Sequence, residues 1–461
     1  MGILSAFVVP HPPLIIPDIG RNDLRKIEKT VEAYKEIGRR ITLIEPDTVV
    51  IASPHSVLYQ NYNHISPGKT AKGDFGRFGC PQIELAVNYD YELVRLITDI
   101  AKEAGIMAGT EGERDKSLDH GILVPLYFIR DILGKTKVVR VSLSGLSLLD
   151  HYHLGEAIDK AVTLSGKRVV FIASGDLSHK LKLTGPYGFA PEGPAFDEKI
   201  TEILASGAFE RLFELDDAFA FKAAECGLRS IAMMAGALDR KAVASELLSY
   251  EGPFGVGYAV ASFDVTGDDS SRCFGDLETL RLKKEAEKTR SAEGELVRLA
   301  RSSLEYYAKN RRHLPMPAGL SPELLEEKAG VFVSLKLDGR LRGCIGTVSP
   351  TTVSLADEII QNAVSAGFRD SRFEPVREDE LDRIVYSVDV LRPAQPVSSL
   401  AELDPKRYGI IVRFKGRSGL LLPNLEGVDT VEEQLRIALR KGNISPEDDY
   451  EIKKFEVIRH H

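Results

Sequence analysis

The sequence contains few cysteines and no long hydrophobic run. Its four cysteines, Cys80, Cys226, Cys273 and Cys344, are too few and too widely spaced for a disulfide framework, which indicates free thiols in a reducing compartment. No segment reaches the roughly 18 consecutive apolar residues of a membrane-spanning helix. The first residues are apolar, but they lack a basic leader and are soon interrupted by prolines, unlike a secretory signal. We therefore expect a cytoplasmic protein that does not insert into a membrane.

The sequence also lacks a strong charge of either sign. A formal net charge of -8 over 461 residues argues against nucleic-acid binding driven by overall electrostatics, above all for the N-terminal part. There is no internal repeat and no low-complexity tract. A hydrophobic content of 43% and a charged content of 28% are typical of globular proteins, and the length allows two or three domains.

Residues 1–267 alternate short apolar runs with helical segments. The predicted strands are Ile3–Val9, Thr48–Ala52, Val138–Leu143 and Arg168–Ala173, and the predicted helices include Asn22–Arg40, Tyr91–Ala104 and Gly121–Leu133. Because these strands show no polar alternation, we expect both of their faces to be buried. The pattern predicts an α/β domain with a central, mostly parallel sheet and helices on both faces.

The composition changes after residue 267. Residues 268–292 form a polar and charged stretch that we interpret as a linker with some helical content. Residues 293–461 predict an α+β domain with an antiparallel sheet. Its predicted hairpin turns at Asp338-Gly339, and Thr430 with Glu433 forms a capping box for a helix that ends near Gly442. The remaining predicted elements are a helix over 352–366 and strands at Ile384–Leu391, Ile410–Phe414 and Gly419–Leu422.

Histidines stand where strands of the first domain end. His11, His55 and His179 each follow a predicted strand, and His120 stands just before a predicted helix. Ligands of open α/β sheets bind beyond the carboxyl ends of the strands, so we expect these side chains to converge there. Imidazole is a ligand of Fe, Zn and Cu, so the placement predicts a mononuclear metal site. We interpret the histidines without such a placement as structural: His64, His151, His153 and His313.

The third ligand of this site is either Glu225 or Cys226. Asp216 and Asp217 can cap a predicted helix that runs through both residues to Arg229. Consecutive helical side chains point about 100° apart, so the two residues are not expected to bind one ion together. A glutamate would suit Fe(II), whereas a thiolate would favour Cu(I) or Zn. The alternative for Cys226 is a small buried apolar side chain.

An ordered set of motifs over residues 1–265 resembles the LigB-like family of class III extradiol dioxygenases, and more closely its Memo branch. The motifs are His11-Pro12-Pro13, Ser53-Pro54-His55, Asp119-His120-Gly121, Ser174 to His179 and Glu225-Cys226-Gly227. The resemblance implies that the first two histidines hold the metal, that His179 is the catalytic acid/base, and that His120 contacts substrate. In Memo proteins a cysteine takes the third metal position, which corresponds to Cys226, and Asp176 accompanies His179.

The chemistry that this resemblance implies is a metal-dependent oxidation. One divalent or redox metal is expected, with Fe(II) favoured and Zn or Cu as alternatives. The substrate would be a small aromatic diol or a modified peptide. His179 could move a proton because its pKa lies near neutrality, and Asp176 could orient its ring. Tyr187, Phe189 and Phe254 are candidates for the lining of a substrate pocket, although aromatic residues are more often core.

Residues 290–459 resemble the AMMECR family. The motif Leu341-Arg342-Gly343-Cys344-Ile345-Gly346 carries the resemblance, supported by Phe368 to Phe373 and Gly419 to Pro423. Arg342 could lower the pKa of the Cys344 thiol, or the thiol could simply pack in a bulged hairpin. Arg369 and Arg372 could bind an anion or pair with neighbouring carboxylates. The candidate ligand of this domain is a nucleotide, RNA or peptide.

A Memo-like domain fused to an AMMECR-like domain resembles components of the AmmeMemoRadiSam system. That context implies a radical S-adenosylmethionine protein as partner. The sequence therefore predicts a metal-dependent oxidoreductase of the extradiol dioxygenase type. The alternative is a metal-binding or redox scaffold that does not open aromatic rings.

Overall fold

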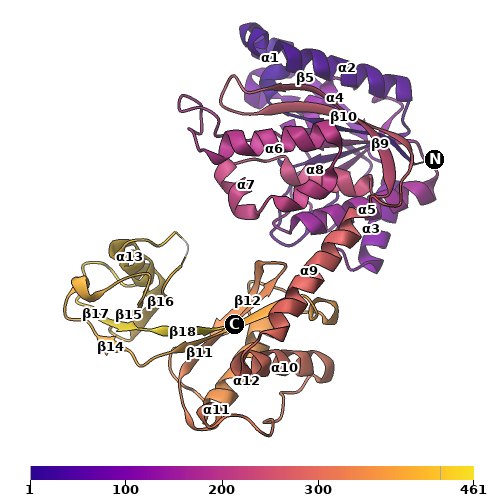
Figure 1. Cartoon of the computed structure of the whole chain (residues 1–461). Helices are drawn as coiled ribbons and strands as arrows, with labels where there is room; N and C mark the ends of the chain where they lie inside the picture. The colour runs from indigo at the N-terminus through magenta and orange to yellow at the C-terminus, as the bar shows by residue number, and fades with distance from the viewer. Residues whose placement is uncertain (1, 426) are drawn as a thin grey trace. The chain divides into compact units, whose positions relative to one another are not determined.

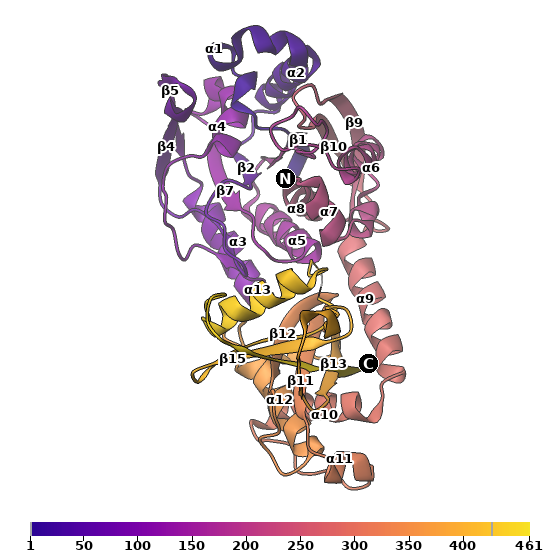
Figure 2. The same ribbon diagram turned by 90° about the vertical axis from the view of Figure 1, so that its left-hand side faces the viewer.

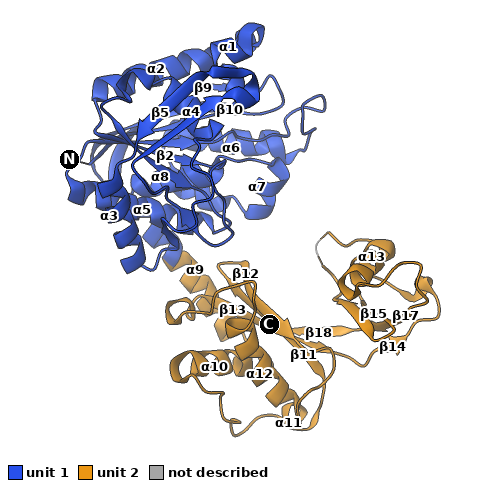
Figure 3. Ribbon diagram, turned by 180° about the vertical axis from the view of Figure 1, so that it is seen from behind, with its two compact units in different colours: residues 1–279 blue, residues 280–461 orange. Residues whose placement is uncertain are grey.

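The computed structural model describes residues 2–425 and 427–461. The chain divides into two compact units, unit 1 up to Thr279 and unit 2 from Leu280 to His461 (Figure 3). Helix α9 (Phe274–Ser291) spans the division, so the polar stretch predicted as a linker is largely helical. Within the described residues, no helix is long and apolar enough to cross a membrane.

Unit 1 is built on a six-stranded sheet with the strand order β7-β2-β8-β1-β10-β9. The first four strands are parallel, and β10 and β9 are antiparallel to their neighbours. The strand bounds are β1 (Ile3–Val9), β2 (Thr48–Ser53), β7 (Lys137–Ser142), β8 (Val169–Ser174), β9 (Lys241–Glu251) and β10 (Tyr258–Asp268). The predicted mostly parallel sheet is confirmed. Strand β8 lies between β1 and β2, which places the residues that follow these three strands side by side.

Helices cover both faces of this sheet, as predicted (Figure 1). Phe7 and Val9 pack with α2 (Glu28–Ile44) and α4 (His120–Tyr127), whereas Ala6 and Val8 pack toward the other face. The helices of the other face are α3 (Tyr91–Glu103), α5 (Leu148–Ser165), α6 (Glu192–Ser206) and α8 (Leu228–Ala237). Helices α5 and α8 lie side by side (Figure 2). Alternate residues of a strand therefore enter two separate cores.

Three predicted helices of unit 1 have different ends in the structure. The helix predicted over Asn22–Arg40 begins as a 3-10 segment (Arg21–Ile27), and α2 continues from Glu28 to Ile44. The helix predicted over Gly121–Leu133 ends at Tyr127, and a separate 3-10 turn follows at Arg130–Ile132. The helix predicted from Asp216 through Arg229 is wrong, because α7 (Asp217–Ala223) stops at Ala224 and α8 starts only at Leu228. The smaller elements are α1 (Pro17–Gly20), β3 (Asn63–His64), β4 (Thr70–Phe75), β5 (Cys80–Asn88) and β6 (Ala108–Gly109).

Unit 2 contains two four-stranded antiparallel sheets, which confirms the predicted α+β class. The first sheet comprises β12 (Arg340–Gly346), β11 (Gly330–Leu337), β13 (Ile384–Leu391) and β18 (Val457–His460). Helices α10 (Glu295–Asn310) and α12 (Leu355–Phe368) cover one of its faces, and α11 (Pro322–Glu326) adds to that core.

The second sheet of unit 2 has a helix of its own. It comprises β14 (Gln395–Pro396), β17 (Glu451–Phe455), β15 (Gly409–Phe414) and β16 (Arg417–Leu421). Helix α13 (Val431–Gly442) packs on Ile410 and Val412 of β15. Leu391 of the first sheet packs with Ile411 and Phe455 of the second sheet, so a small apolar cluster joins the two sheets.

Candidate metal centre

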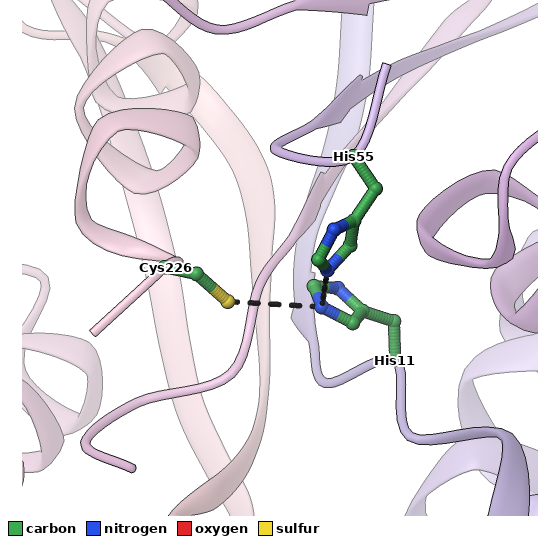
Figure 4. A group of neighbouring side chains, drawn as sticks. All are labelled: His11, His55 and Cys226. Carbon is green, nitrogen blue, oxygen red and sulfur yellow. Dashed lines mark hydrogen bonds between the residues drawn. The ribbon is translucent and has the colours of Figure 1, made fainter. Parts of the chain in front are cut away.

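Three potential metal ligands from distant segments of unit 1 converge beyond the carboxyl ends of its parallel strands. His11 follows β1, His55 follows β2, and Cys226 lies between α7 and α8 (Figure 4). Their donor atoms all lie within 4.8 Å of one another. The Nε2 atoms of His11 and His55 are 2.9 Å apart, and the Cys226 Sγ is 3.7 Å from the Nε2 of His11. These three residues are called the donor group below.

The imidazole of His11 is oriented by Ser174 at the end of β8. The Ser174 hydroxyl donates to the carbonyl oxygen of Gly121 (2.6 Å), so it accepts a hydrogen bond from the Nδ1 of His11 (3.1 Å). That arrangement places the proton of the ring on Nδ1 and leaves the Nε2 lone pair directed at the donor group. Burial lowers the pKa of His11 to about 4, so the ring is neutral at pH 7 and able to ligate.

Two glycines bring Cys226 close to the end of β8. A Cβ atom on Gly175 would lie 2.2 Å from the Cα of Gly227, so only glycines permit this approach of the two backbones. The Cys226 amide donates to the carbonyl oxygen of Asp176 (3.3 Å), and the Asp176 amide lies 3.3 Å from the Cys226 Sγ. Burial raises the pKa of the Cys226 thiol well above its ordinary value. A coordinated cation would reverse that shift and favour the thiolate.

Glu225 lies outside the donor group. Its carboxylate accepts a hydrogen bond from the backbone N–H of Leu228 (2.7 Å) and so satisfies a free donor at the start of α8. Ala224, just before it, has a positive φ of 54° and ends α7. The expected helical geometry of residues 225 and 226 is therefore wrong. Their side chains point to different places because both residues lie in the non-helical segment between α7 and α8.

His179 and Asp176 lie beside the donor group. The His179 Nε2 is 3.9 Å from the Oδ2 of Asp176, and its Nδ1 donates to the carbonyl oxygen of Ala224. Burial lowers the pKa of His179, but Asp176 raises it more, and the net shift is upward. Burial likewise raises the pKa of Asp176, yet His11 and His179 hold it below its ordinary range. Asp176 also accepts the backbone N–H of His11 (2.9 Å), so it connects both histidines.

His120 packs against the histidines of the donor group without joining it. Its ring centroid lies 4.0 Å from that of His55 and 5.3 Å from that of His11. Burial lowers the pKa of His120, and His11 lowers it further. The structure thus brings His11, His55, His120, Asp176, His179 and Cys226 into one region.

Comparisons with known families fit this arrangement. Residues 5–261, more than half of the chain, match the family of the catalytic LigB subunit of aromatic ring-opening dioxygenase. The chain belongs to the LigB family. Residues 297–460 match the AMMECR1 family, so the predicted fusion is confirmed. Residues 5–261 are called the LigB domain below, and residues 297–460 the AMMECR1 domain.

Some similar proteins match the whole chain, and others match only about a third of it. The chain is 41% identical over 468 aligned residues to protein CA_C1420 of Clostridium acetobutylicum, covering 100% of this chain and 99% of that protein. A protein of Thermotoga maritima is 51% identical over 166 residues, which cover 36% of this chain and 95% of that protein. The crystal structure of protein PH0010 from Pyrococcus horikoshii matches with 34% identity and a TM-score of 0.33, over 36% of this chain and 88% of that one.

The LigB domain also contains a polar network that sequence reasoning missed. Asp119 accepts hydrogen bonds from Ser53 (2.8 Å) and Ser56 (2.7 Å), and Arg140 lies 3.3 Å from its carboxylate. Because Asp119 precedes His120 and the serines flank His55, this network fixes both segments. Arg140 is 2% exposed in the middle of β7. A single charge inside an apolar strand was the signal in the sequence, since a buried charge requires a partner.

The other candidate residues of the LigB domain lie apart from the donor group. His64 bonds the carbonyl oxygen of Glu111, His151 bonds Ser147 and Ser144, and His153 pairs with Glu156. Among the aromatic candidates, Tyr187 packs against His179, with the two ring centroids 5.1 Å apart. Phe254 packs instead against the core around α2, and Lys26 lies over its ring.

The motif of the AMMECR1 domain contains charged side chains that are largely paired. Arg342 forms a two-pronged ion pair with Glu380 (2.9 and 3.0 Å) and also donates to the Glu374 carbonyl oxygen. Arg372 pairs with Asp370, which in turn accepts the backbone N–H of Cys344 (2.9 Å). Arg369 is exposed at the end of α12. The Arg342 and Arg372 side chains are thus engaged by carboxylates, which was one of the two predicted alternatives for Arg372.

Proposed function

We propose that the LigB domain binds one transition-metal ion through His11, His55 and Cys226 and acts as a metal-dependent oxidoreductase on a small aromatic diol. The observation that carries this proposal is the convergence of three donor atoms within 4.8 Å at the sheet edge. Metal–nitrogen bonds of about 2.0 Å and metal–sulfur bonds of about 2.3 Å place tetrahedral ligand atoms about 3.3 to 3.6 Å apart. Two of the three separations, 2.9 Å between His11 and His55 and 3.7 Å between His11 and Cys226, are close to those values.

The donor set bears on which metal binds. Two imidazoles and one thiolate are softer ligands than the set of two histidines and one carboxylate that suits Fe(II). Zn(II) and Cu(I) would therefore compete with Fe(II) more strongly at a site with Cys226 than at a site with Glu225 as the third ligand. Fe(II) is the ion that the dioxygenase resemblance implies, and we retain it as the metal of the oxidoreductase proposal. A bound ion would supply a Lewis acid and, for iron or copper, a one-electron redox centre.

The surrounding residues have distinct proposed roles. Ser174 and Asp176 position His11, through its ring and its backbone N–H respectively. His179 would move a proton at Nε2, because its Nδ1 is already engaged by the carbonyl oxygen of Ala224. Asp176 supports this role by stabilising the protonated ring. His120, whose ring packs at a tilt against that of His55, is placed to contact a substrate that reaches the donor group.

Metal content tests the ligand assignment. The protein and its Cys226→Ala and Glu225→Gln variants are purified anaerobically, loaded with Fe(II), Zn(II) or Cu(I) and measured by elemental analysis. We expect about one ion per chain for the unsubstituted protein and for Glu225→Gln, whose amide oxygen still accepts from Leu228. Cys226→Ala should retain less than about a tenth of the ion. Metal loss in Glu225→Gln with retention in Cys226→Ala would contradict the thiolate site.

Oxygen uptake tests the reaction. The Fe(II)-loaded protein is given a panel of catechols, and oxygen consumption is recorded beside ring-opened product. His179→Gln should lower turnover by about 100-fold or more while leaving metal content unchanged, since proton transfer by a positioned side chain contributes about 10²- to 10⁴-fold. No oxygen consumption with any diol, at full iron loading, would refute the oxidoreductase proposal and leave the metal site standing.

The thiolate ligand and the AMMECR1 domain also favour a second candidate. Here the LigB domain is a metal-binding or redox component that serves a radical S-adenosylmethionine protein in a reducing, cytoplasmic environment, acting on a modified peptide or small molecule. The four free cysteines fit such an environment. Cleavage of S-adenosylmethionine by that partner should accelerate when the metal-loaded chain is added, and Cys226→Ala should not accelerate it. Equal rates with and without the chain would exclude this candidate.

A further inference from the structure

A pocket of about 450 Å³ lies within the AMMECR1 domain, between its two sheets. One wall is formed where β11 begins and β13 ends, and the other by β15 and β17 of the second sheet. This volume falls in the range of roughly 300 to 1,000 Å³ that accommodates small molecules and cofactors. The motif around Cys344 does not line it, so the pocket is distinct from the site expected from the sequence.

The floor of this pocket is apolar. Leu391, Ile411 and Phe455 line it and belong to the cluster that joins the two sheets, and each is at most 5% exposed. Gly330 completes the wall at the start of β11, where an added Cβ would lie 2.5 Å from the Thr347 carbonyl oxygen. The floor is thus a fixed apolar surface, because its residues are held by packing on both sheets.

Four basic side chains surround the same pocket: Lys328, Arg392, Arg413 and Lys453. Arg413 follows Ile411 by two residues on β15, and Lys453 precedes Phe455 by two on β17, so each shares a face with a floor residue. Among the residues that the structure describes, none of these four cations forms an ion pair, although Glu451 stands opposite Arg413 in the ladder. Among the described residues that line the pocket, Glu327 is the single carboxylate.

The contrast within the domain is informative. Arg342, Arg372 and Arg459 are each held by a carboxylate, whereas the cations of the pocket are left without one. Like charges gathered around a concavity raise the local positive potential and favour an anion there. Two of the four are arginines, whose planar guanidinium groups match the oxygens of a phosphate.

We propose that this pocket binds a mononucleotide, through its phosphate and the flat face of its base. The phosphate would lie among the four cations and the base against the apolar floor. A single-stranded RNA site is less well matched, because such sites stack bases on exposed aromatic rings and Phe455 is 2% exposed. The proposal concerns the AMMECR1 domain alone and does not depend on the metal site.

Calorimetry on the full chain tests this proposal with three probe sets: the four 5′-mononucleotides AMP, GMP, CMP and UMP, the matching nucleosides, and inorganic phosphate. At least one mononucleotide should bind about tenfold more tightly than its nucleoside and than phosphate. The double substitution Arg413→Glu with Lys453→Glu should weaken that binding at least tenfold. Lys441→Glu, at an exposed position of α13 outside the pocket, is the matched control and should leave it unchanged.

Several outcomes would overturn the proposal. Equal binding of nucleotide and nucleoside would show that the cations do not recognise phosphate, and equal weakening by Lys441→Glu would show unspecific attraction. If an RNA oligonucleotide or an acidic peptide binds more tightly than any mononucleotide, the proposed ligand class is wrong. If the double variant shows an altered circular dichroism spectrum, Arg413→Gln serves in its place. It should weaken binding at least threefold, and an unchanged affinity would refute the site.

Discussion

The LigB domain and the motif region of the AMMECR1 domain differ in whether their functional side chains already have charged partners. In the LigB domain, His11 and Cys226 are buried or half-buried, and their donor atoms face one another rather than a charged partner. In the AMMECR1 domain, Arg342 and Arg372 are tied to carboxylates and to carbonyl oxygens. Both regions carry the motifs most specific to their families, yet potential metal ligands face one another in the first, whereas Arg342 and Arg372 of the second are already paired.

This difference has an energetic meaning. A buried polar atom without a good partner costs free energy, so an arrangement of facing lone pairs persists where a ligand compensates for it. A buried ion pair whose hydrogen bonds are all made instead resists removal of either partner, because the other charge is then left alone. Substitutions in the donor group should therefore change metal binding, whereas substitution of Arg342, whose ion pair is buried, should change stability.

The largest expected effect is in His11→Ala. Two remaining donors cannot hold the ion, so its affinity should fall by more than about 1,000-fold, beyond the roughly 100-fold loss typical of an outer partner. His64→Ala is the control, since His64 is also buried but bonds a backbone carbonyl outside the donor group. Metal titration followed by elemental analysis measures both. Equal metal loss in the two variants would remove the distinction between donor and structural histidines.

Asp197 gives the next largest effect, and it concerns pH. It is 1% exposed, its carboxylate accepts from the Ser178 amide and the Tyr250 hydroxyl, and burial raises its pKa from 3.8 to about 7. The folded state therefore favours the protonated form. The contribution to stability is fully present below about pH 4 and is lost as the pH rises through about 7, by roughly 4 kcal/mol at most.

Asp197→Asn isolates this contribution from the other titrating groups. Its amide oxygen can still accept from Ser178, and its charge is absent at every pH. The difference in unfolding free energy between the variant and the unsubstituted protein, measured by urea titration from pH 4 to 8, should grow in favour of the variant. A difference that stays constant with pH would show that the carboxyl titrates normally in the folded protein.

A smaller effect is expected in the AMMECR1 motif. Arg342→Ala leaves the buried Glu380 carboxylate without its partner, which should lower the unfolding free energy by about 2 kcal/mol. Arg369→Ala, at an exposed position of the same motif region, should change it by less than about 0.5 kcal/mol. Thermal unfolding compares the two, and metal content should match the unsubstituted protein in both. A loss of metal in Arg342→Ala would break the separation between the regions.

Much of the frame of the site follows from the sequence. The apolar runs at Ile3–Val9, Thr48–Ala52 and Arg168–Ala173 correspond to β1, β2 and β8, since strands buried on both faces require uninterrupted apolar residues. The side chains that follow them meet because the carboxyl ends of parallel strands share an edge. The antiparallel strands β9 and β10 were not predicted. Strand β9 has a mixed sequence and is only partly buried, whereas the mostly apolar residues 258–263 of β10 are buried and were an available signal.

The choice between Glu225 and Cys226 could not be read from the sequence. It depends on the break at Ala224, a residue that ordinarily favours a helix. The break is stabilised by tertiary contacts: Ser178 and His179 donate to the carbonyl oxygen of Ala223, and His179 also bonds that of Ala224. Local propensity contains no information on these partners, which arrive from the end of β8. The glycine pair Gly175 and Gly227 was the available signal.

The smallest expected effect tests whether Ser174 positions His11, and it compares one buried serine of each domain. In Ser174→Ala the Nδ1 of His11 loses its acceptor, so the ring can rotate and the metal affinity should fall about tenfold, the lower end of effects for outer partners.

Ser303→Ala is the control, because Ser303 is equally buried and bonds the Ile360 carbonyl oxygen in the AMMECR1 domain. It should cost about 1 kcal/mol of stability and leave metal affinity unchanged. Competition with a chelator measures the affinities. If Ser174→Ala loses only stability, as Ser303→Ala does, then His11 is held by packing alone and the hydrogen bond at the end of β8 contributes nothing to the metal centre.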